Sequence, residues 1–206
     1  MVITLNNSES INNNDIEILK STNDNPSPFP ILYLNDIDLD YSSFKTASSL
    51  LASEYMVLLH NPYKDLSINT NESIDFNVIS RRIVDILDEH NISSIHIIAH
   101  GFSSILANNF SINYPDYVKS MIYEDFSTEF NVNNRIYNID YSKIACPTLL
   151  LRGSKSDMML PQQNQDIVMS NDLLRSSSIE NVEKDGHFHN VESYISQVTK
   201  FISFYS

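Results

Sequence analysis

The sequence predicts an α/β protein with a mainly parallel, twisted sheet and helices on both of its faces. Short apolar runs alternate along the chain with longer segments whose apolar residues recur at helical spacing. Strands that are apolar at every position are typical of parallel sheets buried on both faces. A length of 206 residues fits one domain, in which residues 1–29 are expected to be partly irregular.

The first half of the chain alternates regularly between the two kinds of segment. Strands are expected at 16–19, 30–34, 56–59 and 95–99, and helices at 41–54, 73–91 and 103–114. In the second helix Asp75 lies in the first turn, where a negative charge is favourable. Pro115 ends the third helix because proline disfavours a helical conformation at the residue before it.

The second half contains a polar segment at 124–143, between two predicted strands. Strands are expected at 118–123, 147–151 and 177–182, and helices from 161 to about 174 and at 191–205. About twenty polar residues are too few for a cap domain, so any pocket should be shallow or completed by an oligomeric partner. Ligands of open α/β sheets bind beyond the carboxyl ends of the strands. The loops at that edge begin at Asn35, His60, His100, Glu124, Arg152 and Lys184.

The composition excludes several classes of partner. The formal net charge is −13, which disfavours binding to nucleic acids and anionic membranes. No apolar run approaches the roughly 18 residues of a membrane span, and no signal peptide is visible. The lone cysteine, Cys146, cannot form an intramolecular disulfide, which fits a reducing, cytoplasmic location.

Glycine is scarce, with three residues in the chain, so each is expected where a side chain would interfere. They are Gly101, Gly153 and Gly186. Three isolated glycines cannot form a phosphate-binding loop or a dinucleotide fingerprint, so neither nucleotide cofactor motif is present and no cofactor is expected.

Residues 95–107 form an expected strand, sharp turn and helix start, and they resemble the nucleophile elbow of the α/β-hydrolase family. The family's Gly-His-Ser-x-Gly sequence aligns with Ala99, His100, Gly101 and, for its last glycine, Ser103. Residues 113–118 continue the match, since they resemble the family's Tyr-Pro-Glu-x-Val. The resemblance therefore places the nucleophile at Gly101.

Two later motifs resemble the same family. Residues 146–157 look like the strand and turn that end in the triad acid, which the resemblance places at Asp157. Asp185-Gly186-His187-Phe188 looks like the turn that carries the triad base, His187. The order of nucleophile, acid and base follows the family pattern.

Departures from the family pattern decide the expected chemistry. Glycine has no side-chain atom that could form an acyl-enzyme. The N–H of Phe102 should persist as one oxyanion donor, and the second would come from the loop at Asn35, with His100 a further pocket candidate. Carboxylates at Asp36 and Asp38 would disfavour an oxyanion if they point inward.

Some alternatives stay open at this point. A shift of two residues would make Ser103 or Ser104 the nucleophile, and Asp125 is an alternative triad acid. The pair His187 and His189, with His60 or His100, could be imagined as a metal site, but no third ligand is recognisable, so no metal is expected.

The resemblance implies two possible functions. In the first, His187 backed by Asp157 acts as a general base on a small, apolar molecule, in lyase, isomerase, cyclase or atypical hydrolase chemistry. In the second, the protein is a catalytically inactive pseudoenzyme that binds a ligand or another protein.

Overall fold

A computed structural model describes residues 16–37, 39, 41–63, 73–157 and 161–206. Seven strands form one sheet in the order β1-β3-β2-β4-β5-β8-β9. Strand β1 pairs antiparallel with β3, and every other neighbouring pair is parallel. The strands are β1 (Ile16–Leu19), β2 (Ile31–Leu34), β3 (Val57–His60), β4 (Ile95–His100), β5 (Val118–Glu124), β8 (Thr148–Gly153) and β9 (Leu174–Ile179). The predicted, mainly parallel sheet is confirmed.

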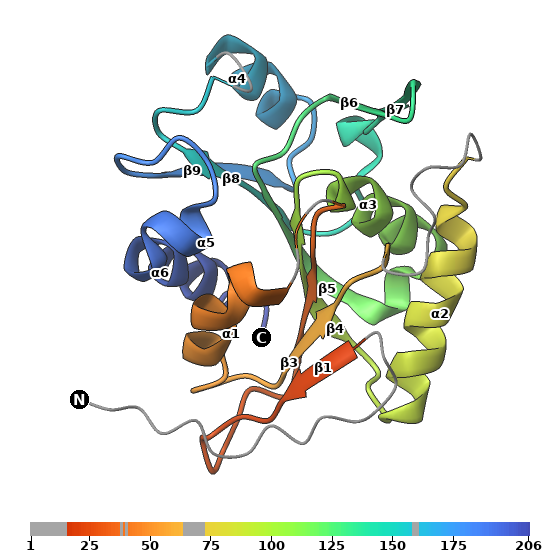
Figure 1. The fold of residues 1–206 in the computed structure, drawn as a ribbon, viewed down its shortest axis with the longest axis vertical. Helices are drawn as coiled ribbons and strands as arrows, with labels where there is room; N and C mark the ends of the chain where they lie inside the picture. Colours follow the sequence, from red (N-terminus) through yellow and green to blue (C-terminus); the bar gives the residue numbers. More distant parts are fainter. Residues whose placement is uncertain (1–15, 38, 40, 64–72, 158–160) are drawn as a thin grey trace.

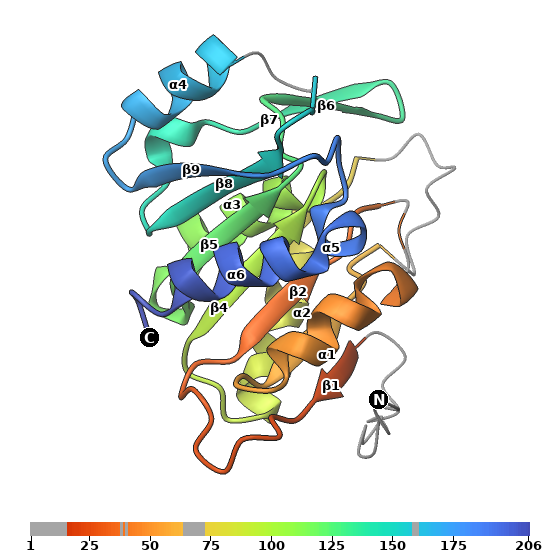
Figure 2. The same ribbon diagram turned by 90° about the vertical axis from the view of Figure 1, so that its left-hand side faces the viewer.

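Helices cover both faces of this sheet (Figures 1 and 2). One face carries α1 (Lys45–Leu51) and α6 (Val191–Ile202), and the opposite face carries α2 (Phe76–Glu89) and α3 (Ser103–Asn113). Helix α4 (Pro161–Met169) lies against β9. Short helical turns are η1 (Tyr41–Phe44), η2 (Pro115–Tyr117), η3 (Tyr141–Lys143) and α5 (Gly186–His189).

Alternation along the strands divides the core into two layers. In β2, Ile31 and Tyr33 pack with α1 and α6, whereas Leu32 and Leu34 pack with α2 and α3. Helix α2 begins at a capped residue, because the Asp75 carboxylate accepts the N–H groups of Asn77 and Val78 at 3.0 and 3.3 Å. In the part of the chain that the structure describes, no helix is long and apolar enough to span a bilayer.

Some boundaries differ from the prediction. The helix expected to reach about residue 174 ends at Met169, and β9 begins at Leu174 instead of residue 177. The reason is a turn at Asn171, whose side chain accepts the N–H of Leu173 at 2.9 Å and donates to the carbonyl of Ile144 at 2.8 Å.

The polar segment after β5 contains regular structure that the sequence analysis did not predict. Strands β6 (Glu129–Val132) and β7 (Arg135–Asn138) form an antiparallel hairpin. Its side chains Phe130 and Tyr137 contact the ring of Phe102, with centroids 5.8 and 5.2 Å away. The segment that was considered too short for a cap therefore packs over the start of α3.

Candidate active site

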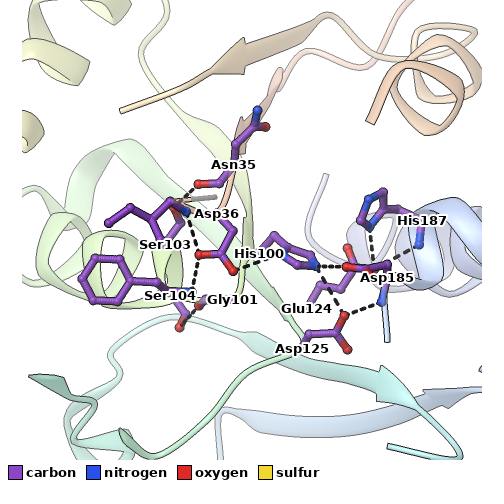
Figure 3. Close-up of polar contacts among 12 residues, drawn as sticks. Asn35, Asp36, His100, Gly101, Ser103, Ser104, Glu124, Asp125, Asp185 and His187 are labelled. Atoms are coloured by element: carbon purple, nitrogen blue, oxygen red, sulfur yellow. Dashed lines mark hydrogen bonds and ion pairs between the residues drawn. The ribbon is translucent and has the colours of Figure 1, made fainter. Parts of the chain in front are cut away.

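Polar side chains gather at the carboxyl ends of β2, β4 and β5 and at the start of α5 (Figure 3). The sheet brings these loops together because parallel strands end at the same edge. The residues are Asp36, His100, Gly101, Glu124, Asp125, Asp185 and His187. This edge is where the sequence predicted the site.

Gly101 forms the turn between β4 and α3 with φ +52°, in the left-handed region that favours glycine. A Cβ atom added to Gly101 would lie 1.9 Å from Oδ2 of Asp36. The Asp36 carboxylate therefore occupies the space that a side chain at residue 101 would need. Gly101 itself donates its N–H to the carbonyl of Glu124 at 2.9 Å, which ties the turn to the end of β5.

The same carboxylate engages the backbone donors that converge on this turn. Oδ1 of Asp36 accepts the N–H of Phe102 at 3.1 Å and the N–H of Ile37 at 2.7 Å. The expected donor from Asn35 is not at this place, because its N–H is directed to the carbonyl of His60 at 3.3 Å. Asp36 does point inward, while Asp38 lies outside the described residues. Two N–H groups that could stabilise a developing negative charge thus already donate to the negatively charged Asp36 carboxylate.

The structure corrects the predicted partner of His187. Nδ1 of His187 lies 3.0 Å from Oε1 of Glu124, and the backbone N–H of His187 donates to the same oxygen at 3.0 Å. Because a carboxylate only accepts, the proton of the ring resides on Nδ1. Asp157 is exposed in the loop after β8, so the predicted Asp157–His187 pairing is wrong.

Glu124 is fully buried at the end of β5. Burial alone would raise the pKa of its carboxyl, but the charge and hydrogen bonds of His187 and the charge of His100 outweigh it, and the pKa is lowered. The second carboxylate oxygen accepts from the hydroxyl of Tyr33 at 3.4 Å. The ring of Phe44 stacks on His187 with centroids 4.0 Å apart and fixes the imidazole plane.

His100 lies between Asp36 on one side and Asp125 and Asp185 on the other (Figure 3). Its Nδ1 is 3.5 Å from Asp36 Oδ2, and its Nε2 is 3.3 Å from Asp125 Oδ2 and 3.1 Å from Asp185 Oδ1. Burial alone would lower the pKa of His100, but the three carboxylates outweigh it and hold the pKa well above its usual value. These contacts have ion-pair distances but not the direction of N–H···O hydrogen bonds.

Asp125 and Asp185 both have left-handed backbone conformations, with φ of 50° and 54°. Aspartate tolerates this conformation better than most residues, yet two such positions beside Gly101 store strain at one site. The N–H of Asp185 donates to Asp125 Oδ2 at 2.6 Å and locks the two loops together. The pKa of Asp185 is lowered, because the interaction with His100, whose Nε2 lies 3.1 Å away, outweighs the opposing effect of burial.

Two groups of described residues offer donor atoms close enough for one metal ion. In each group one ligand atom per residue lies within 4.8 Å of the others. One group is His100, Asp185 and His187, and the other is His100, Glu124 and Asp125. A metal site with His187 and His189 was one alternative from the sequence, but His189 is exposed and belongs to neither group.

Comparisons with known proteins identify the fold. No family model matches the sequence, and a search of curated proteins finds no match. Solved structures do match: a probable hydrolytic enzyme from Pseudomonas aeruginosa PAO1 aligns with a TM-score of 0.76 and 10% identity, over 91% of this chain and 89% of its own. MenH from S. aureus aligns with a TM-score of 0.75 and 11% identity, over 92% and 98%.

A further match is MGS-MChE2, an α/β-hydrolase enzyme from the metagenome of lagoon sediments at Mar Chica, Morocco. It aligns with a TM-score of 0.73 and 13% identity, over 92% of this chain and 95% of its own. The protein has the α/β-hydrolase fold. The resemblance inferred from the motifs is confirmed at the level of the fold.

Within this α/β-hydrolase fold, the serines considered as alternative nucleophiles have structural hydrogen bonds. Ser103 is fully buried and donates to the carbonyl of Asn35, and Ser104 is fully buried and donates to the carbonyl of Gly101 at 2.7 Å. Both hydroxyls are buried and hydrogen-bonded to backbone carbonyls, so they stabilise the turn between β4 and α3. The residues that the sequence analysis missed are Ile37, Asp185 and the true partner of His187, Glu124. Their one signal was position, since Ile37 and Asp185 lie in loops, and Glu124 lies at the end of β5, at the ligand-binding edge of the sheet.

Proposed function

We propose that the protein acts on a small molecule by acid–base chemistry at His187, without forming an ester on a serine. The observation that supports this most directly is the buried Glu124–His187 pair. With its proton on Nδ1, His187 keeps a lone pair on Nε2, and this buried atom has no hydrogen-bond partner among the described residues. An imidazole held by a carboxylate in this way is suited to accept a proton from a substrate or a water molecule.

Glu124 is the positioning residue of this proposal. Its carboxylate fixes the tautomer of His187 and would stabilise the imidazolium that forms when Nε2 accepts a proton. Phe44, stacked on the ring, prevents rotation of the imidazole away from this geometry. The acid predicted from the sequence, Asp157, has no part in the proposal.

The absence of acyl-enzyme chemistry is supported by Gly101 and Asp36 together. Residue 101 has no nucleophilic atom, and the carboxylate above it already accepts the N–H groups of Phe102 and Ile37. A tetrahedral oxyanion would have to displace this carboxylate and would then develop beside its charge.

A second candidate function is a non-catalytic protein that binds a small ligand. It is favoured by the same occupation of both N–H donors by Asp36, because a site that needs no oxyanion stabilisation can keep them filled. The two candidates differ in whether a proton moves at His187, and this difference can be measured.

Proton abstraction can be followed by NMR in D₂O, in which a general base exchanges C–H protons of a substrate for deuterium. A defined library of small metabolites with acidic C–H bonds or hydrolysable groups would be incubated with the wild-type protein and with His187→Ala, Glu124→Gln and His189→Ala. We expect wild type and the exposed-histidine control, His189→Ala, to exchange or convert at least one compound. His187→Ala should be slower by about 10²–10⁴-fold, the usual contribution of a general base.

A fluorophosphonate probe, which reacts with activated serines, should leave the wild-type protein unlabelled. Labelling of a serine would contradict the proposal. If wild type exchanges and converts every compound no faster than His187→Ala, the enzymatic proposal fails and the ligand-binding function is the better conclusion.

A further inference from the structure

The candidate site contains more negative than positive charge. Four carboxylates, those of Asp36, Glu124, Asp125 and Asp185, surround the two imidazoles of His100 and His187. Even two protonated imidazoles would leave two negative charges unbalanced. The exposed Lys184 contributes to the lowered pKa of Asp185, but a charge at the surface compensates buried carboxylates only weakly. Glu124 and Asp125 are buried, and the side chains of Asp36 and Asp185 are 24% exposed. Excess negative charge in such surroundings is costly even where the carboxylates accept N–H groups, so a bound cation would stabilise this arrangement.

Several donor atoms of the cluster are buried without a hydrogen-bond partner. Among the described residues they include both ring nitrogens of His100, Nε2 of His187 and Oδ1 of Asp125. The three residues are no more than 5% exposed. In a simple salt-bridge network the N–H bonds of His100 would point at the carboxylates, yet none of them does so with hydrogen-bond geometry. The ring nitrogens of His100 thus lie close to carboxylate oxygens, but their N–H bonds do not point at those oxygens.

The surroundings of the two imidazoles match those of metal ligands. A metal-bound histidine usually donates its other ring N–H to a carboxylate, which fixes its tautomer and orientation. Nδ1 of His187 faces Glu124 at 3.0 Å, and Nδ1 of His100 lies 3.5 Å from Asp36. Each imidazole thus has a carboxylate near Nδ1, with a hydrogen bond for His187 and at ion-pair distance for His100. An ion that displaces the proton from Nε2 of His100 would find both rings held from the Nδ1 side.

The spacing of the donors also fits a single ion. Nε2 of His100 and Oδ1 of Asp185 are 3.1 Å apart. Two ligands that each lie about 2.1 Å from one ion are separated by roughly 3.0–3.4 Å at octahedral or tetrahedral angles. His100, Asp185 and His187 each offer one ligand atom within 4.8 Å of the others, so a small movement of His187 would complete the set.

We propose that His100, Asp185 and His187 bind one divalent transition-metal ion, with Glu124 and Asp36 orienting the two imidazoles. Two histidines and one carboxylate are a ligand set used for Zn²⁺, Fe²⁺ and Mn²⁺ in proteins. The inference rests on the proposed function for the use of the ion and changes the proton acceptor. With an ion bound, Nε2 of His187 would be a ligand and no longer a base, and a water molecule on the ion would accept the proton in its place.

Metal binding can be tested on the untagged chain of 206 residues after treatment with EDTA and buffer exchange. Calorimetric titration with Zn²⁺ should give one ion per chain, and Co²⁺ should produce the visible absorption of a site with imidazole ligands.

Asp185→Asn retains a residue that tolerates the left-handed backbone, and His100→Gln retains side-chain bulk. Each should weaken Zn²⁺ binding at least 100-fold, while Glu124→Gln, which alters the carboxylate behind His187, should weaken it about 10–100-fold.

The matched control is His189→Ala, which removes an exposed imidazole two residues from His187 and should bind Zn²⁺ like wild type. Circular dichroism of each metal-free variant shows whether it is folded. If His100→Gln is not folded, the result for Asp185→Asn decides the test. No stoichiometric binding by wild type, or equal affinity in Asp185→Asn and wild type, would overturn the proposal. Turnover that depends on His187 and persists after exhaustive chelation would refute the metal site alone, whereas binding of Zn²⁺ without any turnover would refute the proposed function alone.

Discussion

At the turn after β4, the side chain of Asp36 fills the space that a side chain on residue 101 would need. The carboxylate lies where a Cβ of residue 101 would be, and it holds both N–H donors of the turn. Asp36 is a flexible side chain and could move away from a larger residue 101, but its charge would then remain near the turn. The lack of a side chain at residue 101 and the position of the Asp36 carboxylate are therefore two aspects of one local arrangement.

This coupling predicts that Gly101→Ser alone does not create an esterase. The new hydroxyl would compete with Asp36, whose carboxylate still neutralises the donors of Phe102 and Ile37. The double variant Gly101→Ser/Asp36→Ala frees both N–H groups, so we expect it to hydrolyse p-nitrophenyl acetate at least about 10-fold faster than either single variant, since one oxyanion donor is worth roughly 10²–10³. Initial rates and fluorophosphonate labelling measure the effect. Equal rates for Gly101→Ser and the double variant would show that Asp36 does not block the site.

The carboxylate that pairs with His187 could be predicted from the sequence only in part. The motifs identified His187 and the edge of the sheet where its partner lies. They indicated Asp157, with Asp125 as the alternative, and gave no signal for Glu124 at the end of β5. The distinction depends on the path of the loop after β8, which leaves Asp157 exposed, and on the longer side chain of Glu124, which reaches His187 from within the strand.

At the scale of elements, burial determined what could be predicted. Strands such as β2 are buried at every position, and their continuous apolar runs are visible in the sequence. The β6–β7 hairpin is exposed or half-buried throughout, so its pattern is weak. Its clearest signal is Asn133-Asn134, where both residues have positive φ, of 53° and 59°, as two-residue hairpin turns require.

The hairpin is predicted to be held mainly by aromatic packing on Phe102. This side chain is 2% exposed and contacts the rings of Phe130, Tyr137, Phe76 and Tyr63. Phe102→Ala should lower the free energy of unfolding by about 3–5 kcal/mol, as for other buried phenylalanines. Urea denaturation measures this change, with Phe204→Ala as control, because Phe204 is 76% exposed and should cost less than about 0.5 kcal/mol. A similar cost for both variants would mean that the aromatic cluster contributes little.

For the whole molecule, buried histidines with opposite pKa shifts should set the pH of greatest stability. His96, in β4, is buried beside the hydroxyl of Ser120 at 2.8 Å. Burial, and to a lesser extent the charge of Lys119, lowers the pKa of His96 to about 4. A histidine with a lowered pKa contributes stability above its unfolded pKa of about 6.5, and this contribution is lost as the pH falls towards 4. His100 has the reverse shift, because its carboxylate neighbours favour the charged form.

The raised pKa of His100 predicts a loss of stability at alkaline pH in the metal-free protein. Between the unfolded pKa, about 6.5, and the higher folded pKa, the folded state binds more protons than the unfolded state, so the free energy of unfolding falls as the pH rises. Below about 6.5 this contribution is fully present. Urea denaturation from pH 6 to 9 in EDTA should show the decline in wild type and in the exposed-histidine control, His189→Ala, and a flatter curve in His100→Gln. Parallel curves for wild type and His100→Gln would show that His100 is not held in its charged form by Asp36, Asp125 and Asp185.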